Sequence, residues 1–403
     1  MKKTILSMAL CLILILSGCV QRGNESLAST PNSETPPAQT SNSSQSGGSM
    51  VTPIAVKQPD WSSIQGKVKG IYPVGDSKVL ALANKMSLYD LATGKAIAAT
   101  NSPALNYIRV LALDSGYAIV GQTISESSSG GFVQGGSETQ IRAAIYDEQL
   151  VLKSDVDISG LVADREFLIG AEAIAVSPDG NSIAFATMQQ GIMIYDRVNQ
   201  KSTKLIDLTG NDEKANLGIS IIEQIGFTYN GKRVAFKAKS FDVPAILDKP
   251  SFDTVGTVNI DGSGLTNKKP DGYSPKMLTS YPSWLLVAED FKTASGRMMV
   301  MDSKTGEQKI HTLSDKTEGG NIFGSDSGRY FASSVPNKTG WTVRVYETDT
   351  GKLVKEESIF NDGQELYGIN DPMICVSDNT KTCMVLLGHK QKTVDTKIAS
   401  FSF

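Results

Sequence analysis

The sequence predicts an all-β fold that is built from repeats of about fifty residues. Short motifs recur along most of the chain, whereas long apolar stretches with the 3.6-residue period of a helix are few. The 403 residues include 37 glycines, which supply the positive φ angles of tight β-turns. Hydrophobic residues make up 40% of the chain, enough to bury a sizeable core. A helical bundle is therefore disfavoured.

The first recurring motif is a tight turn that leads into an apolar strand. The segment SPDGNSIAFAT, which starts at Ser177, is the clearest example. Asp-Gly and Asn-Gly pairs favour such turns, and alternating or continuous apolar residues after them favour a strand. The motif occurs seven times, beginning at Gly75, Leu113, Ser177, Thr228, Tyr281, Ser325 and Ser377.

The second motif is an apolar pair, an acidic residue and another turn, as in LYDLATGK. It begins at Leu88, Ile145, Ile194, Val258, Val300 and Val345. Together the two motifs predict four short antiparallel strands per repeat, which we name a to d in chain order. We interpret the acids Asp90, Asp147, Asp196 and Asp302 as turn-capping side chains rather than as a catalytic set.

A four-stranded sheet of this size has two apolar faces, and packing such sheets face to face around an axis covers both. The sequence therefore predicts a β-propeller of four-stranded blades, with seven blades favoured and six or eight as alternatives. The SPDG turn and the NIDGSGLT segment at Asn259 resemble the repeats of bacterial WD40-like and TolB-like propellers. The resemblance covers about residues 60–403. The ATGK and DTGK turns are similar to those of quinoprotein-like propellers, but the closing tryptophan of that repeat is missing, so no quinone cofactor is implied.

The amino-terminal residues predict export and anchoring. Two lysines after Met1 precede an apolar run over residues 5–16, too short to span a bilayer but typical of a signal peptide. Leu16-Ser17-Gly18-Cys19 resembles the bacterial lipobox, which implies cleavage after residue 18 and a diacylglycerol group on Cys19. The alternative is an ordinary secretory peptide. We expect a lipid-anchored protein on the outer side of the cell membrane, in contact with the bilayer through its acyl chains.

The sequence divides the mature chain into a tether and a folded domain. Residues 19–50 are rich in Ser, Thr, Asn, Pro and Gly, so they cannot bury enough apolar surface to fold and are predicted to be disordered. Residues 51–403 form the predicted propeller. Because the last repeat ends after its third strand, we expect residues 51–57 to supply the missing outer strand, with a linker as the alternative.

Two cysteines remain in the predicted domain. Cys375 and Cys383 are equidistant from Asn379, the centre of the last a–b hairpin. That symmetry places them opposite one another, and disulfides form outside the cytoplasm. We therefore predict a cross-strand disulfide, with two buried thiols as the alternative.

Strand alternation predicts that the a–b and c–d turns lie on one face of the ring, and the b–c and d–a connections on the other. The b–c segments 123–139, 240–254, 289–296, 336–341 and 388–395 look long, so we expect ligands on that face. Trp284 is expected in the core. The candidate contacts, each with local packing as the alternative, are Phe132, Gln134, Phe241, Asp242, Phe252, Asp253, Asp290, Phe291, Trp341 and His389.

Little in the sequence indicates chemistry. The formal net charge of -3 disfavours a nucleic-acid surface. The two histidines, His311 and His389, lack partners at metal-ligand spacing, and neither a Gly-x-Ser-x-Gly elbow nor a phosphate loop occurs. We therefore predict no catalytic residues, no metal and no cofactor. The favoured function is a non-enzymatic binding or scaffolding platform for an envelope protein, a peptide or a glycan. The alternatives are a propeller-type glycan hydrolase or lyase, and a structural component of an envelope assembly.

Overall fold

A computed structural model describes most of the predicted domain. The chain separates into a unit of residues 1–50, which lies outside the described residues, and a unit spanning Val51–Phe403. Everything below concerns the second unit. Its described residues are 60, 64, 68–124, 132–164, 166–207, 217–242, 251–289, 296–318, 322–338, 340–360, 372–387 and 397–403.

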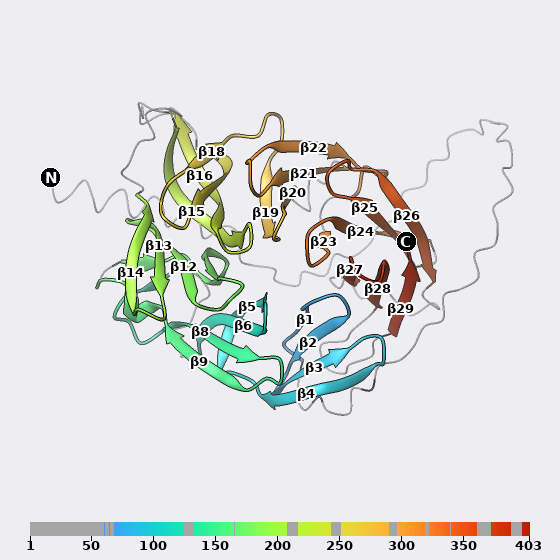
Figure 1. The fold of residues 1–403 in the computed structure, drawn as a ribbon, viewed down its shortest axis with the longest axis horizontal. Helices are drawn as coiled ribbons and strands as arrows, with labels where there is room; N and C mark the ends of the chain where they lie inside the picture. Colours follow the sequence, from blue (N-terminus) through green and yellow to red (C-terminus); the bar gives the residue numbers. More distant parts are fainter. Residues whose placement is uncertain are drawn as a thin grey trace, which may run out of the picture. The chain divides into compact units, whose positions relative to one another are not determined.

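These residues form seven antiparallel sheets that follow one another around a ring, which confirms a seven-bladed β-propeller (Figure 1). Blades 1 and 2 contain β1 (Gly70–Pro73), β2 (Lys78–Leu82), β3 (Lys85–Asp90) and β4 (Lys95–Asn101), then β5 (Leu105–Leu113), β6 (Gly116–Thr123), β8 (Ile141–Asp147) and β9 (Leu152–Asp157). Blade 4 contains β15 (Leu217–Thr228), β16 (Arg233–Asp242), β17 (Phe252–Asn259) and β18 (Thr266–Lys268). Blades 5 and 6 contain β19 (Pro275–Ser280), β20 (Trp284–Glu289), β21 (Arg297–Asp302) and β22 (Gln308–Thr312), then β23 (Ile322–Gly324), β24 (Tyr330–Asn337), β25 (Gly340–Glu347) and β26 (Leu353–Phe360).

Blades 3 and 7 depart from four strands. Blade 3 contains β11 (Ile174–Val176), β12 (Ser182–Thr187), β13 (Gly191–Asp196) and β14 (Lys201–Ile206), and two short strands extend it, β10 (Phe167–Leu168) and β7 (Val133–Gln134). Two 3-10 turns flank β10, η2 (Ser159–Leu161) and η3 (Ala171–Ala173). The described part of blade 7 has three strands, β27 (Met373–Ser377), β28 (Thr382–Leu387) and β29 (Lys397–Ser402).

The turns have the predicted chemistry. Each acid that follows an apolar pair accepts a hydrogen bond from the backbone N–H two residues further along the chain. The four acids are Asp90, Asp147, Asp196 and Asp302. Such side chains replace a backbone partner in the turn and fix its geometry. The interpretation as turn caps is therefore confirmed.

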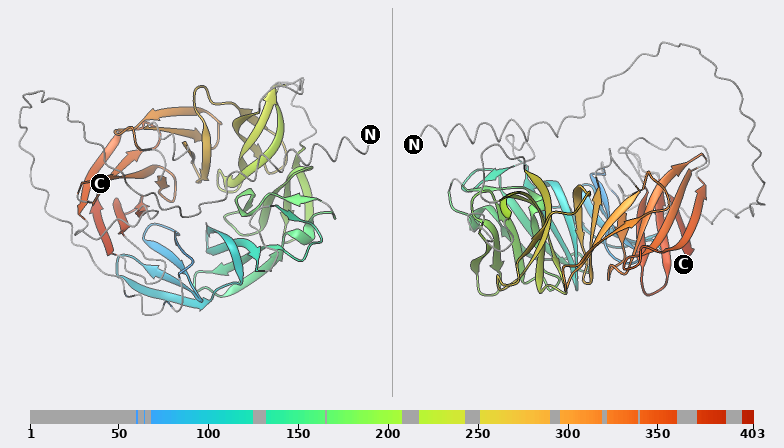
Figure 2. Two further views of the ribbon diagram at one scale, coloured as in Figure 1. Left: turned by 180° about the vertical axis from the view of Figure 1, so that it is seen from behind. Right: turned by 90° about the horizontal axis from the view of Figure 1, so that it is seen from above.

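The two faces of the ring differ as strand alternation predicts, with one correction. The a–b and c–d turns that the structure describes are short, and we call their side the short-turn face. The opposite side carries the b–c and d–a connections, and we call it the long-loop face; Figure 2 (right) views the strands between the two faces. Long b–c connections occur in blades 2, 4, 5 and 7. Segment 336–341 in blade 6 is instead a tight hairpin, because Asn337 pairs with Gly340.

The core consists of apolar layers between neighbouring blades. Alternate residues of a strand point to opposite faces of its sheet. In β16, Val234, Phe236 and Ala238 therefore pack toward blade 3, whereas Ala235 packs toward blade 5. The described residues form seven such clusters, which correspond to the seven interfaces of a closed ring.

The first and last blades close the ring by packing against each other. Ile71 and Val79 of blade 1 lie in one buried cluster with Cys375 and Leu386 of blade 7. Ile64 packs against the same cluster, and the N–H of Asp60 donates to the Gly94 carbonyl at 2.8 Å. The predicted clasp, residues 51–57, lies outside the described residues.

Polar turns on the short-turn face join blades 6, 7 and 1. The N–H of Ser327 donates to the Asp378 carboxylate at 3.1 Å, and the Ser377 hydroxyl donates to Asp76 at 2.8 Å. Asp326 faces both carboxylates. Burial, followed by the hydrogen bond with Asp76 and the charges of Asp76 and Asp378, raises the pKa of Asp326 to about 7.

This raised pKa predicts a pH-dependent stability. Because the pKa of Asp326 lies above its ordinary value of 3.8, protonation favours the folded state, so stability is lost as pH rises from about 4 through about 7. We expect Asp326→Asn to raise the thermal midpoint more at about pH 8 than at about pH 5. Differential scanning calorimetry of both proteins measures this, and an equal shift at the two pH values contradicts it.

The predicted disulfide is wrong, because the hairpin register differs by one residue from the assumed symmetry. Cys383 pairs with Val376, and Cys375 pairs with Met384. A one-residue shift sends a side chain to the other face of the sheet. Cys383 therefore packs toward blade 6 and Cys375 toward blade 1, and both are free thiols. Burial raises the pKa of Cys375 to about 12, which makes its thiol inert.

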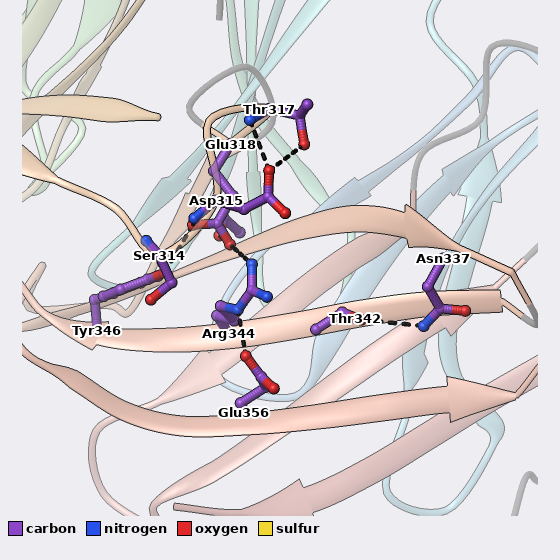
Figure 3. A network of polar contacts seen from close by, with 10 residues as sticks. Ser314, Asp315, Thr317, Glu318, Asn337, Thr342, Arg344, Tyr346 and Glu356 are labelled. Atoms are coloured by element: carbon purple, nitrogen blue, oxygen red, sulfur yellow. Dashed lines mark hydrogen bonds and ion pairs between the residues drawn. The ribbon is translucent and has the colours of Figure 1, made fainter. Parts of the chain in front are cut away.

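A buried carboxylate fixes the connection between blades 5 and 6 (Figure 3). Glu318 follows β22, and its side chain is fully buried. Its carboxylate accepts hydrogen bonds from the Arg344 guanidinium at 2.7 Å and the Tyr346 hydroxyl at 2.7 Å. The Ser333 hydroxyl donates to it at 3.0 Å. Arg344 reaches Glu356 at 2.5 Å on its other side.

A buried guanidinium joins the inner strands of blades 2, 3 and 4. A β-bulge places Tyr107 and Ile108 of β5 opposite the single residue Gly121 of β6, and Arg109 follows them. The Nη1 atom of Arg109 donates to the carbonyl oxygens of Glu172 and Ile174 at 2.8 Å. It also donates to the carbonyl oxygen of Ile225 at 2.9 Å.

Candidate functional site

The structure places the predicted contact residues in three regions. Phe132 and Gln134 belong to the b–c connection of blade 2, where β7 pairs with β10. Trp341 is only 6% exposed and packs in the core between blades 6 and 7, so local packing explains it. Trp284 is half-buried and packs against the core between blades 5 and 6, as expected. The remaining described candidates are all in blade 4, and three lie outside the described residues: Asp290, Phe291 and His389.

Blade 4 brings four of the candidates together at the long-loop end of one hairpin. Phe241 and Asp242 end β16, while Phe252 and Asp253 begin β17. Ser240 pairs with Phe252, and the next pair joins Lys239 to Asp253. Because residues directly opposite in a sheet share a face, Asp253 points to the same side as Lys239, toward blade 5.

Charged side chains fill this end of the interface between blades 4 and 5. We call the group formed by Glu223, Lys237, Lys239, Asp253 and Lys276 the lysine seam. The ammonium of Lys239 lies 2.6 Å from Oδ1 of Asp253, and that of Lys237 lies 3.3 Å from the same atom. The ammonium of Lys276, which comes from β19 of blade 5, lies 3.6 Å from Oδ2. Lys237 is also paired with Glu223.

Local sequence explains how the seam forms. Residues 233–241 of β16 alternate, so Ala235, Lys237 and Lys239 all face blade 5. Glu223 is an extra residue in β15. Ile222 pairs with Ala238 and Gln224 pairs with Lys237, so no residue of β16 stands opposite Glu223. Such a bulge turns a side chain away from the regular pattern of its strand. The Glu223 carboxylate thereby meets the Lys237 ammonium.

The side chains of the seam differ strongly in their exposure to solvent. Lys237 is 4% exposed and Asp253 is 10% exposed, whereas Lys239 and Lys276 are 31% and 39% exposed. Burial acts to raise the pKa of Asp253, but contact with Lys239 and the charges of Lys237, Lys239 and Lys276 outweigh it and hold that pKa below its ordinary value. Asp253 therefore stays ionised and orders the lysines around it.

Two aromatic rings lie at the same end of blade 4, and that of Phe241 is on the face of the sheet that carries the seam. The ring of Phe252 is covered on one side by the ammonium of Lys269, 4.3 Å from the ring centroid, a cation–π contact. The ring of Phe241 lies over Gly218 of β15, where any side chain would collide with it. Both rings are half-buried, so each keeps part of its apolar surface exposed.

Sequence reasoning found Asp253 but missed the lysines and Glu223. The missed signal is in the strand RVAFKAKSFD, where Lys237 and Lys239 stand two residues apart in a largely apolar segment and therefore share one face. In a strand that is buried on both faces, such lysines must pair with acidic side chains or extend to solvent. Their partners come from other strands, so the strand sequence alone does not identify them.

Comparison with known proteins adds no further assignment. No protein-family model matches the chain, and no curated protein matches it. Within the residues that the structure describes, no group of three or more His, Cys, Asp or Glu side chains is placed to hold a metal ion. In that same part of the chain, no helix has the length and apolar character needed to cross a membrane.

Proposed function

We propose that this chain is a lipid-anchored, extracytoplasmic protein whose propeller is a non-enzymatic binding platform. The long-loop face would bind its partner, which is an envelope protein, a peptide or a glycan. The observation that carries the proposal is the difference between the two faces of one rigid ring. One face has only short turns among the described residues, and the other has long connections and exposed lysines.

The anchoring half of the proposal rests on the sequence. Residues 1–18 would be removed, Cys19 would carry the acyl chains, and residues 20–50 would act as a flexible spacer. Two or three acyl chains hold a protein stably in a bilayer, whereas a single chain does so only marginally. The propeller would then face the outside of the cell with its long-loop face free to meet a partner.

Site-directed photo-cross-linking in cells tests the proposal. A benzophenone amino acid would be placed at Gln134 or Asp242, both exposed on the long-loop face, and at Val198 as a control at a c–d turn of the short-turn face. We expect adducts from the first two positions and none from Val198. In the Cys19→Ala variant, we expect the protein to leave the membrane fraction. Adducts from neither long-loop position, or unchanged membrane association of Cys19→Ala, contradict the corresponding half of the proposal.

A structural role in an envelope assembly is the second candidate. Several exposed apolar residues lie at or next to c–d turns along the rim: Val151, Leu152, Val198, Ile260, Leu353 and Val354. Exposed apolar surface of this kind favours contact with neighbouring subunits. Adducts from Val198 but not from Asp242 would favour this candidate over the first.

A further inference from the structure

The lysine seam has more hydrogen-bond donors than acceptors. Each ammonium carries three N–H donors, and the seam has three ammonium groups against two carboxylates. Lys237 is satisfied, because it is buried between Glu223 and Asp253. Lys239 and Lys276 share the single carboxylate of Asp253 and have no other acceptor among the described residues. The surplus donors therefore belong to the two most exposed lysines.

The weakest pair in the seam is the one nearest to solvent. Lys276 is 3.6 Å from Asp253, beyond hydrogen-bond distance, and it is the most exposed of the three lysines. An incoming carboxylate could therefore bind Lys276 and Lys239 without breaking a buried pair. Asp253 and Lys237 would stay in place beneath it and keep the two ammonium groups apart.

The surface beside the seam suits a chain that also carries apolar side chains. Phe241 follows Lys239 by two residues in β16, so its ring lies on the face of the sheet that carries the charged group, whereas Phe252 pairs with Ser240 and faces the other side. A polyphosphate or a sugar phosphate has no apolar group to place on the Phe241 ring. An acidic peptide has both carboxylates and apolar side chains.

We propose that the lysine seam binds an acidic peptide segment of a partner protein, with carboxylates on Lys239 and Lys276 and an apolar side chain against Phe241. This inference rests on the proposed function, because it assigns the class of partner to the same face. Binding depends on charge, so it weakens as salt is added.

Fluorescence anisotropy with a defined ligand tests the inference. The ligand is a fluorescein-labelled peptide of alternating Glu and Leu, and linear polyphosphate of equal charge is the competitor. The double variant Lys239→Gln/Lys276→Gln should bind this peptide at least about tenfold more weakly than the unaltered protein. The control Lys201→Gln/Lys352→Gln removes two exposed lysines in blades 3 and 6 and should leave binding unchanged. Equal thermal midpoints for both variants exclude unfolding as the cause.

Three results would overturn the inference: no binding of the peptide at low salt, equal loss in the control variant, or competition by polyphosphate as strong as that by unlabelled peptide. Cross-linking from Asp242 in cells, repeated in the Lys239→Gln/Lys276→Gln background, separates this inference from the proposed function. Adducts that persist there leave the binding platform intact and reject the acidic partner. Loss of adducts only in that background supports both.

Discussion

Replacement of Glu318 by alanine is expected to lower the free energy of unfolding by about 4 kcal/mol. The carboxylate is fully buried and accepts hydrogen bonds from Arg344, Tyr346 and Ser333. Its loss leaves a guanidinium that is 12% exposed with only Glu356 as partner, and it removes the acceptor of two buried hydroxyls, those of Tyr346 and Ser333. Breaking a buried ion pair by removing one member costs more than the pair itself contributes, because the other charge stays buried.

Urea unfolding of Glu318→Ala, with Glu356→Ala as the matched control, measures this effect. Both residues bind the same guanidinium, but Glu356 is 49% exposed, so its removal should cost less than about 1 kcal/mol. The double variant Glu318→Ala/Arg344→Met removes the stranded charge as well. We expect its loss of stability to be smaller than the sum of the losses caused by Glu318→Ala alone and Arg344→Met alone. Equal costs for Glu318→Ala and Glu356→Ala would contradict a role for burial.

The fold could be predicted because its local signals agree with its overall arrangement. The turn at Asp179-Gly180 and the acid at Asp196 each fix a hairpin within a few residues, and the structure forms both. The repeat count followed from the same motifs. The extension of blade 3 by β7 and β10 could not be predicted, since two-residue strands carry almost no periodicity and pair with residues far away in the chain.

The sequence did not predict features that depend on the exact register of a hairpin or on side chains from other strands. The a–b hairpin of blade 7 pairs Ser377 with Thr382, so its centre lies between Asn379 and Thr380 rather than at Asn379. That half-residue difference separates the two cysteines onto opposite faces of the sheet. For the candidate site, Asp253 could be found as an acid after a long loop. The lysines that surround it come from β16 and β19 and meet it only when two blades pack together.

Replacement of Arg109 by methionine is expected to lower the free energy of unfolding by about 3 kcal/mol, the second large effect. Methionine keeps much of the length of the side chain but removes the donors that bind the carbonyl oxygens of Glu172, Ile174 and Ile225. Those carbonyls belong to the innermost segments of blades 3 and 4, while Arg109 itself is in blade 2. A buried carbonyl without a donor costs about 1–3 kcal/mol; the bonds to Ile174 and Ile225 are partly buried and the bond to Glu172 is exposed, so the first two account for most of the effect.

Glu172→Gln is the control, because it tests the charge of Arg109 rather than its hydrogen bonds. Glu172 lies 3.8 Å from the guanidinium and its side chain is 63% exposed, so this ion pair should contribute less than about 1 kcal/mol. Arg109→Lys should be intermediate, because its ammonium has three donors but its side chain is one bond shorter than that of arginine and does not reach the position of Nη1. Unfolding in urea, followed by tryptophan fluorescence, gives all three values. If Arg109→Met and Glu172→Gln are equally stable, the attraction between charges, and not the bonds to the inner strands, explains why an arginine stands at this position.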